Sequence, residues 1–226
     1  HLMSDTHDNP QLTLWGAGTT RTIRPHWVLH ELGLAYKKHL IGSRTGETET
    51  PEYRALNPRG KIPVLQDGDF VLAESAAIIN YLVEHYGVET DLVPPPGSRE
   101  RALYDQWCFF IMTELDAHTL YVIRRHGDLA NLYGEAPNAI KAAEQGFARQ
   151  VEVVAQALRE GGPYLLGDTF TCADVLLTSC LTWADYCNIP VADVLRDYTK
   201  RLTSRAAYRQ AAAINGGPIG VPESVD

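Results

Sequence analysis

Cysteine is scarce in this sequence, and its four cysteines have no spacing that suggests a metal site. There is no Cys-x-x-Cys pair, and no cysteine stands at a zinc-like spacing from a histidine. Cys108, Cys172, Cys180 and Cys187 all lie in apolar stretches, which is typical of buried free thiols. We therefore expect no metal and no disulfide framework, and a reducing cytoplasm as the compartment.

The chain also lacks long apolar runs. No uninterrupted stretch approaches the ~18–20 apolar residues of a membrane-spanning helix, so we expect no membrane partner. No segment near the start resembles a signal peptide, and His1-Leu2-Met3 looks like a cloning remnant, so we expect the native start near Met3. Hydrophobic residues make up 45% and charged residues 21% of the 226, which predicts a packed globular protein.

Basic residues are outnumbered, 20 against 28 acidic ones, and the net charge is −8. A protein that binds nucleic acid through phosphates has the opposite balance, so we expect no nucleic-acid partner. The stretch before Gly87 is nearly neutral, with 8 basic and 10 acidic residues, so it can still hold a small anion. A dinucleotide-binding glycine loop is missing, because Gly16-Ala17-Gly18 lacks the third glycine.

The first 86 residues alternate strand-like and helix-like patterns. Strands are predicted at residues 12–15, 36–41, 62–65 and 70–72, and helices at 20–32, 51–56 and 75–85. The connection Asp67-Gly68 favours an antiparallel hairpin between the last two strands. The resulting order, βαβαββα, is that of a thioredoxin-like α/β domain.

Proline and glycine cluster where the first domain ends, with three prolines and two glycines between residues 86 and 97. Beyond them every pattern is helical, at residues 99–125, 138–159, 171–187, 191–203 and 204–214. We therefore predict a thioredoxin-like domain at residues 11–86, a linker at 87–98 and an all-α helical bundle at 99–226.

Four local motifs accompany this organisation: the segment from Asn57 to Leu65 (Asn-Pro-Arg-Gly-Lys-Ile-Pro-Val-Leu), Glu74-Ser75, the segment from Gly167 to Asp174, and a threonine-rich loop after the first strand. Together with the domain order, they resemble the cytosolic glutathione S-transferase family, in particular bacterial members with a serine- or threonine-type loop. The resemblance covers nearly the whole chain from Leu12 onward. The fold and the site residues that follow are what this resemblance implies.

In the first motif, the resemblance implies a cis peptide bond before Pro63. It also implies that the backbone of Ile62 pairs with the cysteinyl part of glutathione, and that Lys61 pairs with the glycyl carboxylate. The alternative is that Pro63 merely begins an edge strand, where a missing N–H costs little.

Glu74-Ser75 stands where a predicted strand meets a predicted helix, and the unpaired N–H groups of a helix N-terminus suit a carboxylate. The resemblance implies that Glu74 faces the ammonium group of the γ-glutamyl end and that Ser75 binds its carboxylate. A plain N-cap by Ser75 is the alternative reading, and the two are compatible. The third motif contains Thr171 and Asp174 at capping-box spacing, to which we assign a structural role only.

The loop Gly18-Thr19-Thr20-Arg21-Thr22 occupies the place where the family supports the glutathione thiol with a Tyr, Ser or Cys side chain. This loop has none of these three residue types, so Thr19 and Thr20 are the catalytic candidates, with help from Arg21 at the same site. A threonine hydroxyl can donate a hydrogen bond to a thiolate. One such bond, at roughly 1.5–3 kcal/mol, would lower the thiol pKa by about one to two units. An ordinary N-cap by Thr20 is the alternative.

The electrophile is expected between the domains, against the predicted helix that begins near Arg99. Phe109, Met112 and Asp116 lie on one face of that helix by their spacing, and we expect them to contact the substrate. The alternative is that this face serves domain packing or a dimer surface.

The resemblance implies a glutathione transferase, with glutathione as co-substrate and a small hydrophobic electrophile as the other partner. It also implies a homodimer. Two alternatives stay open: a glutathione-dependent disulfide or peroxide reductase of the same fold, and a non-catalytic binding module.

Overall fold

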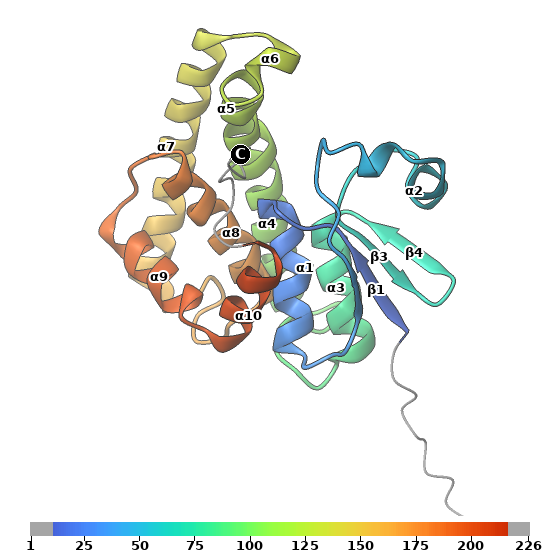
Figure 1. Cartoon of the computed structure of the whole chain (residues 1–226). Helices are drawn as coiled ribbons and strands as arrows, with labels where there is room; N and C mark the ends of the chain where they lie inside the picture. The colour runs from blue at the N-terminus through green and yellow to red at the C-terminus, as the bar shows by residue number, and fades with distance from the viewer. Residues whose placement is uncertain (1–10, 217–226) are drawn as a thin grey trace, which may run out of the picture.

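The computed structural model describes residues 11–216 and has the predicted fold class, a small α/β domain followed by helices (Figure 1). The first domain consists of β1 (Leu12–Trp15), α1 (Thr20–Glu31), β2 (Lys37–His39), a 3-10 turn (Glu47–Glu49), α2 (Pro51–Leu56), β3 (Val64–Asp67), β4 (Phe70–Ala73) and α3 (Ser75–Tyr86). The expectation about Met3 lies outside the described residues.

The four strands form one sheet in the order β2-β1-β3-β4. β1 runs parallel to β2 and antiparallel to β3, and β3 and β4 form the predicted hairpin. The parallel pair needs a crossover connection, which α1 supplies. This mixed sheet with its helices is the thioredoxin-like arrangement predicted from the sequence.

Helices make up the remainder of the described chain: α4 (Arg99–Phe110), a π-helical segment (Ile111–Leu120), α5 (Tyr121–His126), α6 (Ala130–Tyr133), α7 (Pro137–Gly161), α8 (Cys172–Tyr186), α9 (Asp193–Thr203) and α10 (Ala206–Ile214). Residues 87–98 contain no helix or strand. No described helix combines the length and the apolar character needed to cross a membrane.

The long helix predicted at residues 99–125 is present, but its middle is wider than expected. Residues 111–120 form a π-helix between α4 and α5, and α5 continues to His126. Thr119 Oγ1 donates to the carbonyl oxygens of Leu115 at 2.7 Å and Glu114 at 3.1 Å. Such wide turns are uncommon and are often found at functional sites.

Helix α1 joins the two domains. It packs against α3 in its own domain and against α8 and α10 of the helical domain, so α1 and α3 lie between the sheet and the helical bundle (Figure 1). Its apolar residues Ile23, Trp27 and Val28 are fully buried. Because one apolar cluster runs through both domains, the loop that precedes α1 is held at the domain boundary.

The predicted capping box at the start of α8 is present. The Thr171 backbone N–H donates to Asp174 Oδ2 at 2.9 Å, and the Thr171 side chain accepts from the first turn of the helix. Asp174 also accepts hydrogen bonds from Leu165 N and from Tyr198 Oη. Asp174 therefore connects three segments of the helical domain, which is a structural role.

Candidate active site

One pocket is lined by every residue that was predicted to bind glutathione. The two catalytic candidates, Thr19 and Thr20, lie outside it. We call it the Glu74 pocket; its volume is about 360 Å³. Its lining comprises Arg21, Asn57, Arg59, Lys61, Ile62, Pro63, Ala73, Glu74, Ser75, Met112, Asp116 and Ala117. These residues come from α1, from the loop before β3, from the junction of β4 and α3, and from the π-helical segment, so the pocket spans the domain boundary.

The loop before β3 presents its backbone to this pocket. The Ile62–Pro63 peptide bond is cis, and β3 begins only at Val64, two residues later than predicted. The Lys61 carbonyl oxygen is fixed from behind, because it accepts hydrogen bonds from Tyr53 Oη and, at 3.0 Å, from Asn57 Nδ2. Within residues 11–216 no hydrogen bond engages the backbone of Ile62, which leaves its N–H and C=O available to a ligand.

At the opposite wall, Glu74 adopts a left-handed backbone conformation with φ of +73° directly before α3. Its carboxylate forms an exposed ion pair with Arg59. Ser75 begins α3 and is 3% exposed, and its Oγ accepts a hydrogen bond from Arg24 Nη1 at 3.1 Å. The pair thus places a carboxylate, a hydroxyl and a helix N-terminus along one side of the pocket.

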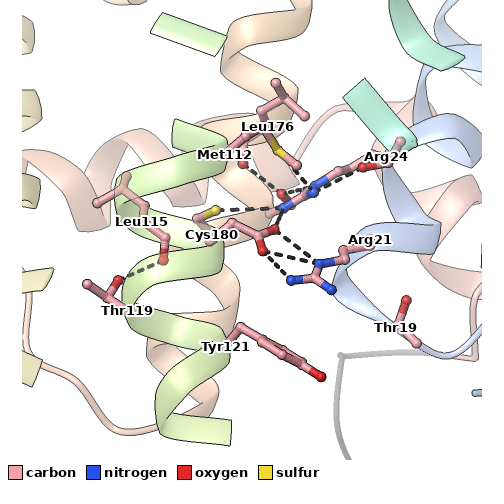
Figure 2. A network of polar contacts seen from close by, with 12 residues as sticks. Thr19, Arg21, Arg24, Met112, Leu115, Thr119, Tyr121, Leu176 and Cys180 are labelled. Atoms are coloured by element: carbon pink, nitrogen blue, oxygen red, sulfur yellow. Dashed lines mark hydrogen bonds and ion pairs between the residues drawn. The ribbon is translucent and has the colours of Figure 1, made fainter. Parts of the chain in front are cut away.

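A buried ion-pair network adjoins this wall through the hydrogen bond from Arg24 to Ser75. Figure 2 shows its two arginines, Arg21 and Arg24. Arg24 and Asp116 are almost fully buried, and Arg24 Nη2 donates to Asp116 Oδ2 at 2.6 Å. Arg21, one turn earlier on α1, donates to Asp116 Oδ1 at 2.5 Å. Burial alone would raise the pKa of Asp116, but the guanidinium groups of Arg24 and Arg21 outweigh it and lower that pKa. Two cations therefore share one buried anion.

Arg24 also connects the network to both domains. Its Nε donates to Ser179 Oγ of α8 at 2.8 Å, and its Nη1 approaches Met112 Sδ at 3.3 Å. Arg24 was not predicted as a site residue. The available signal was a charged residue within the apolar pattern of α1, at helical spacing from Arg21.

The three residues expected to contact the electrophile are placed differently from one another. Met112 and Asp116 line the Glu74 pocket, although the Asp116 carboxylate is occupied by two arginines. Phe109 is 71% exposed and lines neither this pocket nor the Tyr121 pocket defined below. The structure therefore does not bring Phe109 to the candidate site.

The two candidate threonines differ in how their hydroxyl groups are used. Thr19 is the N-cap of α1: its Oγ1 accepts from Thr22 N at 3.0 Å and lies 3.1 Å from Thr22 Oγ1. Thr20 is 2% exposed, and its Oγ1 has no hydrogen-bond partner among the residues that the structure describes. A buried hydroxyl without a partner costs roughly 1–3 kcal/mol and calls for an explanation.

Asn215, at the C-terminal end of α10, holds this loop from the other side. Its side-chain Oδ1 accepts from Thr22 Oγ1 at 2.7 Å and from Gly18 N at 3.2 Å, and its Nδ2 donates to the Thr19 carbonyl oxygen at 3.0 Å. The side chain is buried. Asn215 was not predicted as a site residue, because nearly 200 residues separate it from the loop.

Two further contacts fix the turn before this loop. The His26 ring lies 2.9 Å from the Gly16 carbonyl oxygen and 2.8 Å from Tyr36 Oη. Burial lowers the pKa of His26 to about 4, so the ring is neutral at pH 7. Gly16 has φ of +120°, and a Cβ there would stand 2.8 Å from Ile62 Cβ. A side chain at this position would collide with the ligand-facing loop.

A second pocket adjoins the first, and we call it the Tyr121 pocket. It shares Arg21, Lys61 and Ile62 with the Glu74 pocket, and its other lining residues are Thr19, Thr20, Ser43, Arg44, Tyr121, Arg124 and Trp183. Both candidate threonines line it. A molecule spanning the two pockets would therefore pass the Ile62 backbone and reach the threonine loop. Among the described residues no group of three metal-ligating side chains is present.

Comparison with known proteins gives a consistent result. The family model "Glutathione S-transferase, N-terminal domain" matches residues 10–84, and "Glutathione S-transferase, C-terminal domain" matches residues 137–213. Glutathione S-transferase F10 of Arabidopsis thaliana is 29% identical over 222 residues, which cover 92% of this chain and 99% of that protein.

Solved structures agree. The theta class glutathione S-transferase of Xanthomonas axonopodis pv. citri, with glutathione bound, is 30% identical with a TM-score of 0.74, and the match covers 89% of this chain and 97% of that one. Glutathione transferase URE2P6 of Phanerochaete chrysosporium, in complex with oxidized glutathione, is 26% identical with a TM-score of 0.78, covering 91% and 96%.

Proposed function

The chain belongs to the glutathione S-transferase family, and from that premise we propose that it binds glutathione in the Glu74 pocket and activates its thiol for attack on an electrophile. The observation that carries the proposal is the joined pair of pockets. One pocket offers the polar groups that a γ-glutamyl peptide needs, and the other ends at a buried hydroxyl without a partner.

The assignment of the tripeptide follows from the chemistry of each group. Glu74 faces the ammonium group and Ser75 the carboxylate of the γ-glutamyl end, supported by the N-terminal dipole of α3 and by the buried Arg24. The Ile62 N–H and C=O pair with the cysteinyl amide, next to Pro63. Lys61 pairs with the glycyl carboxylate at the boundary of the two pockets.

Between the two threonines, we assign the thiolate hydrogen bond to Thr20. The Thr19 hydroxyl already caps α1, whereas Thr20 Oγ1 has no partner within residues 11–216. A hydroxyl that donates to sulfur stabilises the thiolate without ionising itself. Arg21 adds positive charge nearby, although Asp116 neutralises part of it.

The chemical step then needs little from the protein. The thiolate donates an electron pair to the electrophilic carbon, a carbon–sulfur bond forms, and a leaving group such as chloride departs with its bonding pair. A modest pKa shift is preferable, because a thiolate that is stabilised too strongly loses nucleophilicity.

We further propose a homodimer that works in the cytoplasm. The free cysteines Cys108, Cys172 and Cys180 are buried and suit a reducing compartment. Large apolar side chains are exposed on both domains, on β4 and on α4, and a second copy of the chain would cover them.

The proposal is tested by calorimetric binding of glutathione and by turnover of 1-chloro-2,4-dinitrobenzene, using Thr20→Val and Thr20→Ser as a matched pair. We expect Thr20→Val to bind glutathione but to lose about tenfold to hundredfold in kcat/KM, the value of one charge-assisted hydrogen bond. Thr20→Ser keeps the hydroxyl and stays within about threefold.

Two results would contradict this account. Absence of glutathione binding at millimolar concentration favours the non-catalytic binding module. Full activity in Thr20→Val with loss in Thr19→Val moves the hydrogen bond to Thr19. Assays with a disulfide and a hydroperoxide distinguish the transferase from the reductase reading.

A further inference from the structure

The Tyr121 pocket, where the electrophile must approach the thiol, is strongly cationic. Four of its ten lining residues are basic: Arg21, Arg44, Lys61 and Arg124. No carboxylate is among them. The whole chain carries a net charge of −8, so the positive charge of this pocket is opposite in sign to that of the protein as a whole. A concave site lined by one sign of charge raises the local concentration of the opposite charge.

Two of the four cations already have assigned partners. Arg21 pairs with Asp116 at 2.5 Å, and Lys61 faces the glycyl carboxylate under the proposed function. Arg44 and Arg124 form no ion pair within the described part of the chain. Two guanidinium groups are therefore available to an anion that enters beside the peptide.

Arg44 is held at this pocket in an unusual way. Its φ is +63°, a left-handed conformation that residues other than glycine and asparagine rarely adopt. From the loop between β2 and α2, its Nη2 reaches Tyr121 Oη at 3.4 Å and Tyr133 Oη at 3.5 Å, so it contacts the helical domain. The Arg44 guanidinium donates to the Tyr133 hydroxyl and lowers its pKa.

The remaining wall of the pocket is aromatic. Tyr121 and Trp183 line it, and the Arg21 guanidinium lies 4.8 Å from the centre of the Tyr121 ring (Figure 2). At about 60 Å³ the free volume is small, so lining side chains must move before a six-membered ring can enter. Such side-chain changes are common when a ligand binds.

We propose that the electrophile is an aromatic or conjugated compound that carries a carboxylate or a similar anionic group, bound by Arg44 and Arg124. This inference rests on the proposed function and changes its substrate class from simply hydrophobic to anionic and aromatic. The anionic group pairs with the two guanidiniums, the ring lies against Tyr121, and the reacting carbon faces the thiol near Thr20.

The experiment compares 4-chloro-3,5-dinitrobenzoate with its neutral amide, 4-chloro-3,5-dinitrobenzamide. In both, the thiolate forms a carbon–sulfur bond at the chlorine-bearing carbon and chloride leaves with the bonding pair. Each kcat/KM is divided by the rate constant of free glutathione with the same compound, which removes the difference in intrinsic reactivity. We expect this normalised ratio to favour the benzoate by roughly tenfold.

Variants assign the preference to its residues. Arg44→Gln and Arg124→Gln should each lower the benzoate-to-amide ratio about fivefold, a typical value for a partly exposed charge pair. Arg149→Gln is the matched control, since Arg149 is an exposed arginine on α7 that lines neither pocket. It should leave the ratio unchanged.

Three outcomes would contradict the inference or a part of it. A ratio of one or less in the unmodified protein, with the amide turned over, overturns the anionic substrate class and leaves the transferase function intact. A preference for benzoate that survives both arginine variants overturns the assignment to Arg44 and Arg124. If calorimetry shows no glutathione binding, the proposed function fails and this inference fails with it.

Discussion

Asp116 is the residue on which the buried part of the site depends. It brings one carboxylate from the π-helical segment to Arg21 and Arg24 of α1, and Arg24 in turn donates to Ser75. A buried ion pair contributes little net stability by itself, but removal of one partner leaves an uncompensated charge. The main effect of Asp116 on stability is therefore that it neutralises the buried Arg24.

The variant Asp116→Asn should lower the free energy of unfolding by about 3–5 kcal/mol, because Arg24 would remain buried without an anion. Urea denaturation followed by circular dichroism measures the change. The exposed Asp197→Asn on α9 is the matched control and should stay within about 0.5 kcal/mol. Equal small effects of the two variants would show that Arg24 is satisfied by other groups.

His26 gives the fold a pH dependence. Its folded-state pKa is about 4, below the unfolded value of about 6.5, so the unfolded chain takes up a proton first as the pH falls. The contribution of His26 to the free energy of unfolding is fully present above pH ~6.5 and is lost as the pH falls toward 4. Between pH 7.5 and pH 5 this difference amounts to about 2 kcal/mol.

The comparison of the unmodified protein with His26→Gln tests that contribution. The variant should be less stable at pH 7.5, but it should lose about 2 kcal/mol less on acidification to pH 5. Unfolding free energies from urea titrations at the two pH values measure this. If the free energy of unfolding fell equally in both proteins between pH 7.5 and pH 5, carboxylates and not His26 would cause the acid sensitivity.

At the scale of elements, α10 supports the loop that carries the candidate threonines Thr19 and Thr20. Asn215 at its end makes three side-chain hydrogen bonds to the segment from Gly18 to Thr22. The Asn215 backbone carbonyl oxygen also accepts from Gly18 N at 2.9 Å. Thr20 lies within this loop, so its position depends on these contacts. Asn215 lines neither pocket, so we expect it to act as a positioning residue.

The variant Asn215→Ala should lower kcat by roughly tenfold while glutathione affinity changes less than about threefold, because the peptide wall is untouched. It should also cost about 1–3 kcal/mol of stability, since buried partners lose their hydrogen bonds. Steady-state kinetics and calorimetry measure both. Asn138→Ala, an exposed change on α7, is the control. A proportional loss of affinity and kcat would indicate general unfolding instead.

The sequence predicted which elements form, but not the contacts that span them. The periodicity of residues 99–125 indicated a helix, and no local pattern revealed the π-helical turn that carries Asp116. Lys61, Ile62, Glu74 and Ser75 line one pocket, as the family resemblance of their two local motifs implied. Arg24 and Asn215 were not predicted, because their hydrogen-bond partners lie far away in the sequence and no local pattern indicates them.

At the scale of the whole molecule, exposed apolar side chains lie on both domains. Phe70 and Val71 on β4, and Leu103 and Phe109 on α4, are each more than a third exposed. Phe109, which was expected at the substrate, is one of these exposed side chains. Its place at a dimer surface, the alternative to substrate contact, stays a prediction. Large exposed apolar groups are typical of protein interfaces.

We expect the protein to sediment as a dimer and Phe109→Ser to shift it toward the monomer by at least tenfold in dissociation constant, because hydrophobic anchors dominate such interfaces. Sedimentation velocity over a concentration series measures this. Leu132→Ser, an exposed apolar residue on α6, serves as control. A monomer at all concentrations, or equal effects of both changes, would contradict the proposed dimer.

The most direct test of the central claim is the pKa of the glutathione thiol when bound, measured from the ultraviolet absorbance of the thiolate across a pH series. For the unmodified protein we predict a value about one to two units below that of the free thiol, which is near 8.5. In Thr20→Val the value should return toward that of free glutathione. A bound thiol that titrates like free glutathione in the unmodified protein would contradict the account.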